Sequence, residues 1–135
     1  MAVQGDRPTD PALAGGYFVP PTIFADVDNK ARIAQEEIFG PVMSVIPFST
    51  PEEALAMSND NEYGLAAAVW TRDIKKAMNT ARALRAGIVW INDTQTAPSE
   101  TPWGGYKQSG IGRELGASGV EDYLEAKHIY VNLAE

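Results

Sequence analysis

Glu37 and Phe39 are the residues of this sequence whose types and spacing most readily suggest a binding site. They lie in the stretch AQEEIFGPV, residues 34–42, and a Gly40-Pro41 turn follows them directly. A carboxylate can accept two hydrogen bonds from a vicinal diol such as a ribose, while the phenyl ring could flank a flat ring of the same ligand. A solvated glutamate beside a core phenylalanine is the commoner arrangement of such a pair. Both interpretations stay open at this point.

Residues for other chemistry are scarce. The sequence contains no cysteine and a single histidine, His128, in the apolar stretch AKHIYVNL. The lack of cysteine excludes disulfides, thiolate metal ligands and a cysteine nucleophile. We therefore predict no catalytic residue and no metal site. A serine-dependent hydrolase is a minor alternative, because Ser109 lies near Lys107, although no serine occurs in a recognisable nucleophile motif.

A glycine-rich segment follows residue 93, with glycines at positions 104, 105, 110, 112, 116 and 119. Three of them form the spacing G-x-G-x-x-x-G, which differs from the dinucleotide fingerprint G-x-G-x-x-G between a strand and its helix. Backbone turns that require a positive φ explain these glycines better. Ligands nevertheless collect at loops beyond the carboxyl ends of parallel strands, and long irregular loops of this kind are usually functional.

Composition excludes several classes of function. The chain has 135 residues, 44% of them hydrophobic and 21% charged, as expected for one globular domain. A net charge of −7 argues against a nucleic-acid partner. No apolar run approaches the roughly 20 residues that a membrane span requires, and residues 1–16 lack the order of a signal peptide. We therefore expect a cytoplasmic protein without a membrane partner.

Three apolar segments predict the strands that would position these loops. They are PVMSVIPF at residues 41–48, LAAAVWT at 65–71 and IVWIND at 88–93. Continuous apolar runs of this length are typical of strands that are buried on both faces, so we expect Trp70 and Trp90 in the core. The earlier segment YFVPPTIF is predicted to be an edge or kinked strand, because its two prolines have no N–H to donate.

Helix signals separate the three strands. Thr50 and Pro51 suit the N-cap and first position of a short helix, and a capping-box glutamate follows. A second helix begins after Asp73 and ends at Gly87. One face of it carries Ile74, Ala77, Met78, Ala81 and Leu84. The order strand, helix, strand, helix, strand requires parallel pairing with crossovers, so the predicted fold class is α/β with a parallel sheet.

Over residues 16–133 the sequence resembles the C-terminal quarter of the NAD(P)-dependent aldehyde dehydrogenases. The segments that carry the resemblance, in order, are GGYFVPPTIF, QEEIFGPV, YGLAAAVWT, AGIVWIND and PWGGYKQSGIGRELG. The sequences of the last two segments most resemble the betaine-aldehyde branch of the family. The resemblance implies an N-terminal arm at 1–16, part of the catalytic domain at 17–125 and a C-terminal oligomerisation strand at 126–135.

The resemblance also implies roles for individual residues. Glu37 matches the glutamate that binds the nicotinamide-side ribose of NAD or NADP, and Phe39 matches the phenylalanine that packs against the nicotinamide. Trp103 matches an aromatic position of the substrate tunnel. Arg113 and Glu125 match positions near the subunit interface, where they would form an ion pair across it. Betaine-type members usually have aromatic residues in the loop before the tryptophan, whereas here that loop reads TQTAPSET.

The family's cysteine nucleophile, glutamate base and dinucleotide-binding domain lie upstream of the matching region. Because this chain holds no cysteine, we expect no aldehyde oxidation by the chain alone, and weak or no binding of NAD or NADP. The leading interpretation is a fragment of an aldehyde dehydrogenase that forms homo-oligomers through the strand at 126–135. The alternative is an autonomous small protein that uses the same fold for association.

Overall fold

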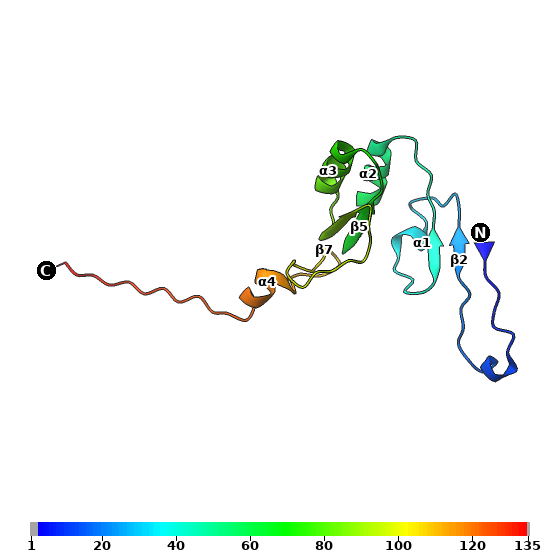
Figure 1. Cartoon of the computed structure of the whole chain (residues 1–135), viewed down its shortest axis with the longest axis horizontal. Coiled ribbons are helices and arrows are strands. Elements are labelled where there is room, and N and C mark those ends of the chain that lie inside the picture. Colours follow the sequence, from blue (N-terminus) through cyan, green and yellow to red (C-terminus); the bar gives the residue numbers. More distant parts are fainter. Residues whose placement is uncertain (1–2, 135) are drawn as a thin grey trace. The chain divides into compact units, whose positions relative to one another are not determined.

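The computed structural model describes residues 3–134 and divides between Ser58 and Asn59 into two compact units (Figure 1). Each unit contains a parallel pair of strands beside helices, so the prediction of a mixed α/β fold is confirmed. The three predicted strands do not share one sheet, however. The strand within residues 41–48 pairs in the N-terminal unit, and the other two pair with each other in the C-terminal unit.

The N-terminal unit is built on a three-stranded sheet in the order β1-β2-β3. Its strands are β1 (Val3–Gln4), β2 (Thr22–Phe24) and β3 (Val42–Ser44). β1 runs antiparallel to β2, and β2 runs parallel to β3. Of the two alternatives predicted for residues 17–24, an edge or a kinked strand, the edge strand is wrong, because β2 is the central strand. Its ladder begins at Thr22, after both prolines, so the missing N–H groups do not fall within it.

Three short helical segments accompany this sheet along the chain. They are η1 (Pro11–Leu13), α1 (Arg32–Gln35) and α2 (Pro51–Asn59), the last of which ends at the first residue of the C-terminal unit. α2 begins at the predicted proline. The Thr50 hydroxyl accepts a hydrogen bond from the N–H of Glu53 at 3.2 Å, and the Glu53 carboxylate accepts one from the N–H of Ser49 at 2.7 Å. Local capping chemistry therefore sets the start of this helix.

The C-terminal unit contains a parallel strand–helix–strand unit of β5 (Ala66–Val69), α3 (Ile74–Ala83) and β6 (Ile88–Ile91). Asp73 caps α3 as predicted, since its carboxylate accepts a hydrogen bond from the N–H of Lys76 at 3.0 Å. The helix ends at Ala83 rather than at Gly87, because Leu84 already has an extended backbone. α3 packs against both strands and buries Ala77 completely.

A second pair of strands joins the glycine-rich segment to the first strand of this unit. β4 (Tyr63–Gly64) pairs antiparallel with β7 (Tyr106–Lys107), and α4 (Gly116–Glu121) follows. Residues 124–134 then form no helix or strand and are exposed throughout. The predicted oligomerisation strand at 126–135 thus has no ladder partner within the described part of this chain. Glu135, like residues 1 and 2 of the predicted arm, lies outside the described residues.

Burial departs most clearly from the sequence-based expectation. Among residues 3–134, Ala77 is the only buried residue of the alanine, aliphatic, methionine and aromatic types. Trp70 is 67% exposed, so its prediction as a core residue is wrong, and Trp90 is only half-buried. Met43 and Phe48 of the predicted buried strand are 58% and 61% exposed. Strands buried on both faces need a covering layer on each side, and among the described elements α3 packs against β5 and β6.

Candidate functional site

Glu37 and Phe39 lie where the chain leaves α1. Glu36 is the C-cap of that helix and has an extended backbone, with ψ at 144°, which ends the helical turn. Phe39 then adopts φ of 52°, a left-handed conformation that is uncommon for a bulky residue. Its ring is 93% exposed. The segment therefore presents the ring outward instead of burying it, which contradicts the interpretation of Phe39 as a core phenylalanine.

The two adjacent glutamates differ in their electrostatic surroundings. Arg32 binds Glu36 through two hydrogen bonds, from Nε to Oε1 at 2.8 Å and from Nη2 to Oε2 at 2.9 Å. The hydrogen bond from the guanidinium lowers the pKa of Glu36, and the same contact raises the pKa of Arg32. Within residues 3–134 the Glu37 carboxylate has no such partner. Of the pair, Glu37 is thus the carboxylate that can accept hydrogen bonds from a ligand.

A pocket of about 310 Å³ adjoins these side chains. Its lining consists of Ile33, Ala34, Glu36, Glu37, Ile38, Phe39, Gly40, Val42, Ser44 and Ile46. One free carboxylate and one exposed ring therefore border the same cavity, together with aliphatic side chains. This combination of a hydrogen-bond acceptor and an apolar surface suits a ligand that carries hydroxyl groups next to a flat ring.

Trp103 borders a second pocket, in the C-terminal unit. Its backbone forms a bridge with Glu114, with both N···O distances at 2.7 Å, which folds the glycine-rich segment into a closed loop. Its ring lies 6.3 Å from that of Trp90 and is tilted by 55°. The pocket has a volume of about 640 Å³. Its lining includes Leu65, Trp103, Ser109, Arg113, Asp122, Tyr123 and five glycines.

The glycines of this segment serve backbone geometry, as predicted. Gly110 and Gly112 have φ of 112° and 84°, which side-chain-bearing residues rarely adopt. Gly87, the residue before β6, lies so close to the loop that a Cβ on it would be 1.7 Å from the carbonyl oxygen of Gly104. The loop and the parallel strands are therefore in direct backbone contact at this point.

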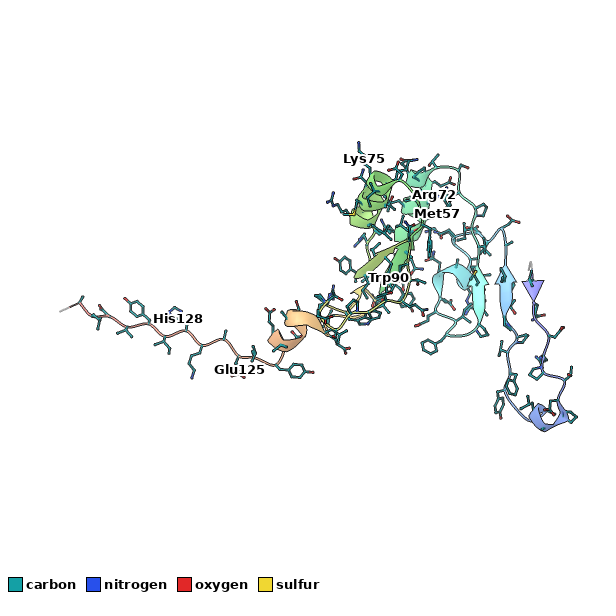
Figure 2. The ribbon with its side chains drawn as sticks, in the orientation of Figure 1. Met57, Arg72, Lys75, Trp90, Glu125 and His128 are labelled. Atoms are coloured by element: carbon teal, nitrogen blue, oxygen red, sulfur yellow. The ribbon has the colours of Figure 1, made fainter. Side chains whose placement is uncertain are left out.

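Arg113 is engaged within its own loop. Its Nη1 donates hydrogen bonds to the carbonyl oxygens of Gly105 at 3.0 Å and Gly112 at 2.6 Å, and its guanidinium lies 5.5 Å from the centre of the Tyr106 ring. Glu125 lies in the exposed segment that follows α4 (Figure 2). Within residues 3–134 the two side chains form no ion pair, so their predicted pairing across a subunit interface stays a prediction.

The structure gives the serine hydrolase alternative no catalytic arrangement. The Ser109 hydroxyl accepts a hydrogen bond from the N–H of Gly64 at 3.0 Å. The Lys107 ammonium, the nearest base in sequence, instead donates to the carbonyl oxygens of Asn59 at 3.0 Å and Asn61 at 2.8 Å. Lys107 thus ties the end of α2 to β7, a contact that sequence reasoning missed. In the described part of the chain, no cluster of three acidic or histidine side chains could hold a metal ion.

The predicted site residues therefore fall into two groups. Glu37 and Phe39 border the pocket of the N-terminal unit, and Trp103 and Arg113 border that of the C-terminal unit. Glu125 borders neither of them. As to membranes, the helices found between residues 3 and 134 are all too short or too polar to cross a bilayer.

Comparison with known proteins gives these pockets a context. The sequence model of the aldehyde dehydrogenase family matches residues 1–129. The betaine aldehyde dehydrogenase of Bacillus subtilis is 54% identical over 132 residues, which are 98% of this chain and 27% of that protein. The NAD(P)+ aldehyde dehydrogenase 1 of Saccharomyces cerevisiae is 52% identical over 121 residues, which are 90% of this chain and 24% of that protein.

Solved structures of aldehyde dehydrogenases are also similar to this chain. A betaine aldehyde dehydrogenase double mutant from Staphylococcus aureus, in complex with NAD+, superposes with a TM-score of 0.93 and 51% identity. The match covers 99% of this chain and 27% of the other. A Mycobacterium tuberculosis aldehyde dehydrogenase complexed with NAD+ has a TM-score of 0.84 and 50% identity over 90% of this chain and 25% of its own. The chain thus spans about a quarter of the length of these relatives.

Proposed function

This chain belongs to the aldehyde dehydrogenase family, and we propose that it is the C-terminal quarter of an NAD(P)-dependent enzyme that oxidises an aldehyde to a carboxylic acid. The observation that carries the proposal is the family match over residues 1–129 of a chain that contains no cysteine. The chain would supply side chains to the cofactor and substrate sites, while a thiolate nucleophile would come from polypeptide outside this sequence. By itself it would not turn over an aldehyde.

Glu37 and Phe39 would contact the cofactor. NAD or NADP, when bound, supplies the acceptor for the hydride that leaves the aldehyde. Glu37 would accept hydrogen bonds from the hydroxyls of the adjoining ribose. This role is supported by its free carboxylate, since Arg32 binds Glu36 instead. Phe39 would pack its exposed ring against the nicotinamide, and the left-handed backbone at this residue keeps the ring outside the apolar interior.

Trp103 would line the path of the aldehyde. It borders the larger pocket, where the tilted Trp90 ring supports its orientation. Two of the named relatives are betaine aldehyde dehydrogenases, which favours a substrate of that type. The loop at residues 94–101 nevertheless has no aromatic side chain that could enclose a quaternary ammonium by cation–π contact. The proposal therefore names an aldehyde without specifying a quaternary ammonium group.

The exposed segment at 126–135 would pair with a strand of another subunit. Ile129, Val131 and Leu133 alternate with polar or aromatic residues there, and all three are exposed in this chain. A segment with an apolar row and without a ladder partner is a template for strand addition. Arg113 and Glu125 would then lie near the same interface, and the enzyme would be a homo-oligomer.

The proposal is tested with a chimera. In it, residues 1–135 of this chain replace the matching 132 residues of the Bacillus subtilis betaine aldehyde dehydrogenase. We expect NADH production from an aldehyde by the chimera and none by the isolated chain at the same concentration. Turnover by the thoroughly purified chain alone would contradict the assignment of the nucleophile to another part of the polypeptide. A folded chimera that binds neither cofactor nor aldehyde would contradict the site assignment.

A further inference from the structure

We infer that Trp90 is a positioning residue for aldehyde binding. Its indole holds the loop at residues 92–102 against β6 and, together with its contact to Trp103, fixes the wall of the path that the aldehyde takes. The role in aldehyde binding rests on the proposed function. The clamp that Trp90 forms rests on contacts within the C-terminal unit alone.

The loop at residues 92–102 receives little order from burial. All of its residues are exposed. It connects the end of β6 to Trp103, whose backbone is fixed by the bridge to Glu114. Exposed segments with few packed side chains open at little cost in free energy. The conformation of this loop therefore depends on the hydrogen bonds that join it to fixed elements.

Trp90 supplies a contact of this kind from β6 (Figure 2). Its indole Nε1–H donates a hydrogen bond to the carbonyl oxygen of Thr96 at 2.7 Å. The same ring lies 6.3 Å from the ring of Trp103 at a tilt of 55°, a geometry typical of interacting aromatic pairs. One half-buried side chain thus contacts both the middle of the loop and the residue that follows it. The position of the loop and the orientation of Trp103 are coupled through this side chain.

The first half of the loop is fixed by further hydrogen bonds. The Asn92 side chain pairs with the backbone of Thr71, accepting from its N–H and donating to its carbonyl oxygen, each at 2.9 Å. The Asp93 carboxylate accepts the Thr96 hydroxyl at 2.6 Å and the N–H of Thr94 at 2.7 Å. The hydroxyl of Thr96 and its carbonyl oxygen are therefore both bound, and the indole of Trp90 is the group that binds the carbonyl.

A clamp of this kind acts on the binding of the aldehyde. Residues 94–101 include no aromatic side chain that could stack on a substrate, so the loop contributes a wall of fixed shape. When only a fraction of the molecules has the competent loop conformation, the apparent dissociation constant rises in inverse proportion to that fraction. The loss of one solvent-exposed hydrogen bond lowers the fraction by about three- to fivefold. The reaction of an aldehyde that is already bound should be unaffected.

The test is steady-state kinetics of Trp90→Phe in the chimera. This substitution removes the indole N–H and keeps an aromatic ring beside Trp103. We expect the KM for the aldehyde to rise about three- to fivefold, with kcat and the dissociation constant of NAD changed by less than about twofold. Thr96→Val removes the hydroxyl bond to Asp93 and should also raise KM. The double variant should show less than the product of the two effects, because both bonds hold the same loop residue.

Trp70→Phe is the matched control. It makes the same substitution in the residue after β5, which is 67% exposed and belongs to neither contact of the clamp. It should leave the KM for the aldehyde unchanged. A second readout needs no activity. In nuclear magnetic resonance spectra of the 135-residue chain, the indole N–H of Trp90 should exchange with solvent at least about tenfold more slowly than that of Trp70.

Several results would overturn the inference. An unchanged KM in Trp90→Phe, or an equal rise in Trp70→Phe, would contradict the role in aldehyde binding. A lower kcat at constant KM would show that Trp90 serves the fold only. Equal exchange rates of the Trp90 and Trp70 indoles would contradict the clamp. A folded chimera without turnover counts against the proposed function instead, and the exchange of the Trp90 indole then decides on the clamp: slow exchange supports it and fast exchange overturns it.

Discussion

The sharpest test of the cofactor site is the comparison of Glu37→Ala with Glu36→Ala in the chimera. The two glutamates are adjacent in sequence, and each substitution removes one carboxylate from the rim of the same pocket. Only Glu36 is bound by Arg32, through contacts of 2.8 and 2.9 Å. If ribose hydroxyls are bound at this pocket, the free carboxylate of Glu37 should account for that binding.

The expected magnitude follows from the exposure of the site. A hydrogen bond to a charged group contributes about 1.5–3 kcal/mol net. Glu37 is exposed in this chain, so water competes for its oxygens, and we take the lower end of that range for the pair of contacts, about 1.5–2 kcal/mol. Since 1.4 kcal/mol corresponds to a factor of ten, Glu37→Ala should weaken cofactor binding by about 10- to 30-fold. Glu36→Ala should leave the dissociation constant unchanged, because it removes a surface ion pair outside the proposed contact.

Calorimetric titration of NAD and NADP into the purified chimera and both variants measures the difference directly. Thermal melting of the same samples establishes that all three proteins are equally folded. The reasoning is refuted if Glu37→Ala changes the dissociation constant by less than about threefold, or if Glu36→Ala weakens binding as much as Glu37→Ala does.

Two further predictions concern the C-terminal unit of the chimera. Gly87→Ala should lower the stability by about 3 kcal/mol or more, because its Cβ would lie 1.7 Å from the Gly104 carbonyl oxygen and two backbone segments would have to separate. Gly15→Ala, whose Cβ would meet nothing within 4 Å, is the matched control, and equal melting curves for the two would count against the close approach of Gly87 to Gly104. Truncation after Glu125 should convert an oligomeric chimera into a monomer by light scattering, and an unchanged oligomer would exclude residues 126–135 from the interface.

Local chemistry made part of the fold predictable. The starts of α2 and α3 follow from a threonine–proline pair and from Asp73, whose hydrogen bonds reach only three residues along the chain. The parallel pairing of β5 with β6 follows from the helix between them. The glycine turns follow from the freedom of Gly110 and Gly112 to adopt positive φ. In each of these cases the deciding interaction lies within the segment or in its direct connection.

Contacts between distant residues were not predictable in the same way. Lys107 reaches the carbonyl oxygens of Asn59 and Asn61, which lie 48 and 46 residues earlier in the chain, and no local pattern indicates that pairing. The left-handed backbone of Phe39 could not be predicted from the sequence either. The residues around it are compatible with a phenylalanine in a core as well as with one beside a ligand. For the candidate site, the sequence indicated the carboxylate and the ring, and the structure showed that Glu36 is bound by Arg32 and Glu37 is not.

The misjudged burial of the strands has a more general cause. An apolar run such as residues 41–48 indicates that the strand is stable when both of its faces are covered. The run does not indicate which part of a polypeptide covers them. The exposure of Met43, Phe48 and Trp70 therefore does not show that the periodicity was misread. Since relatives about four times as long share this backbone, the apolar pattern fits a protein of that length, in which these three side chains would be interior.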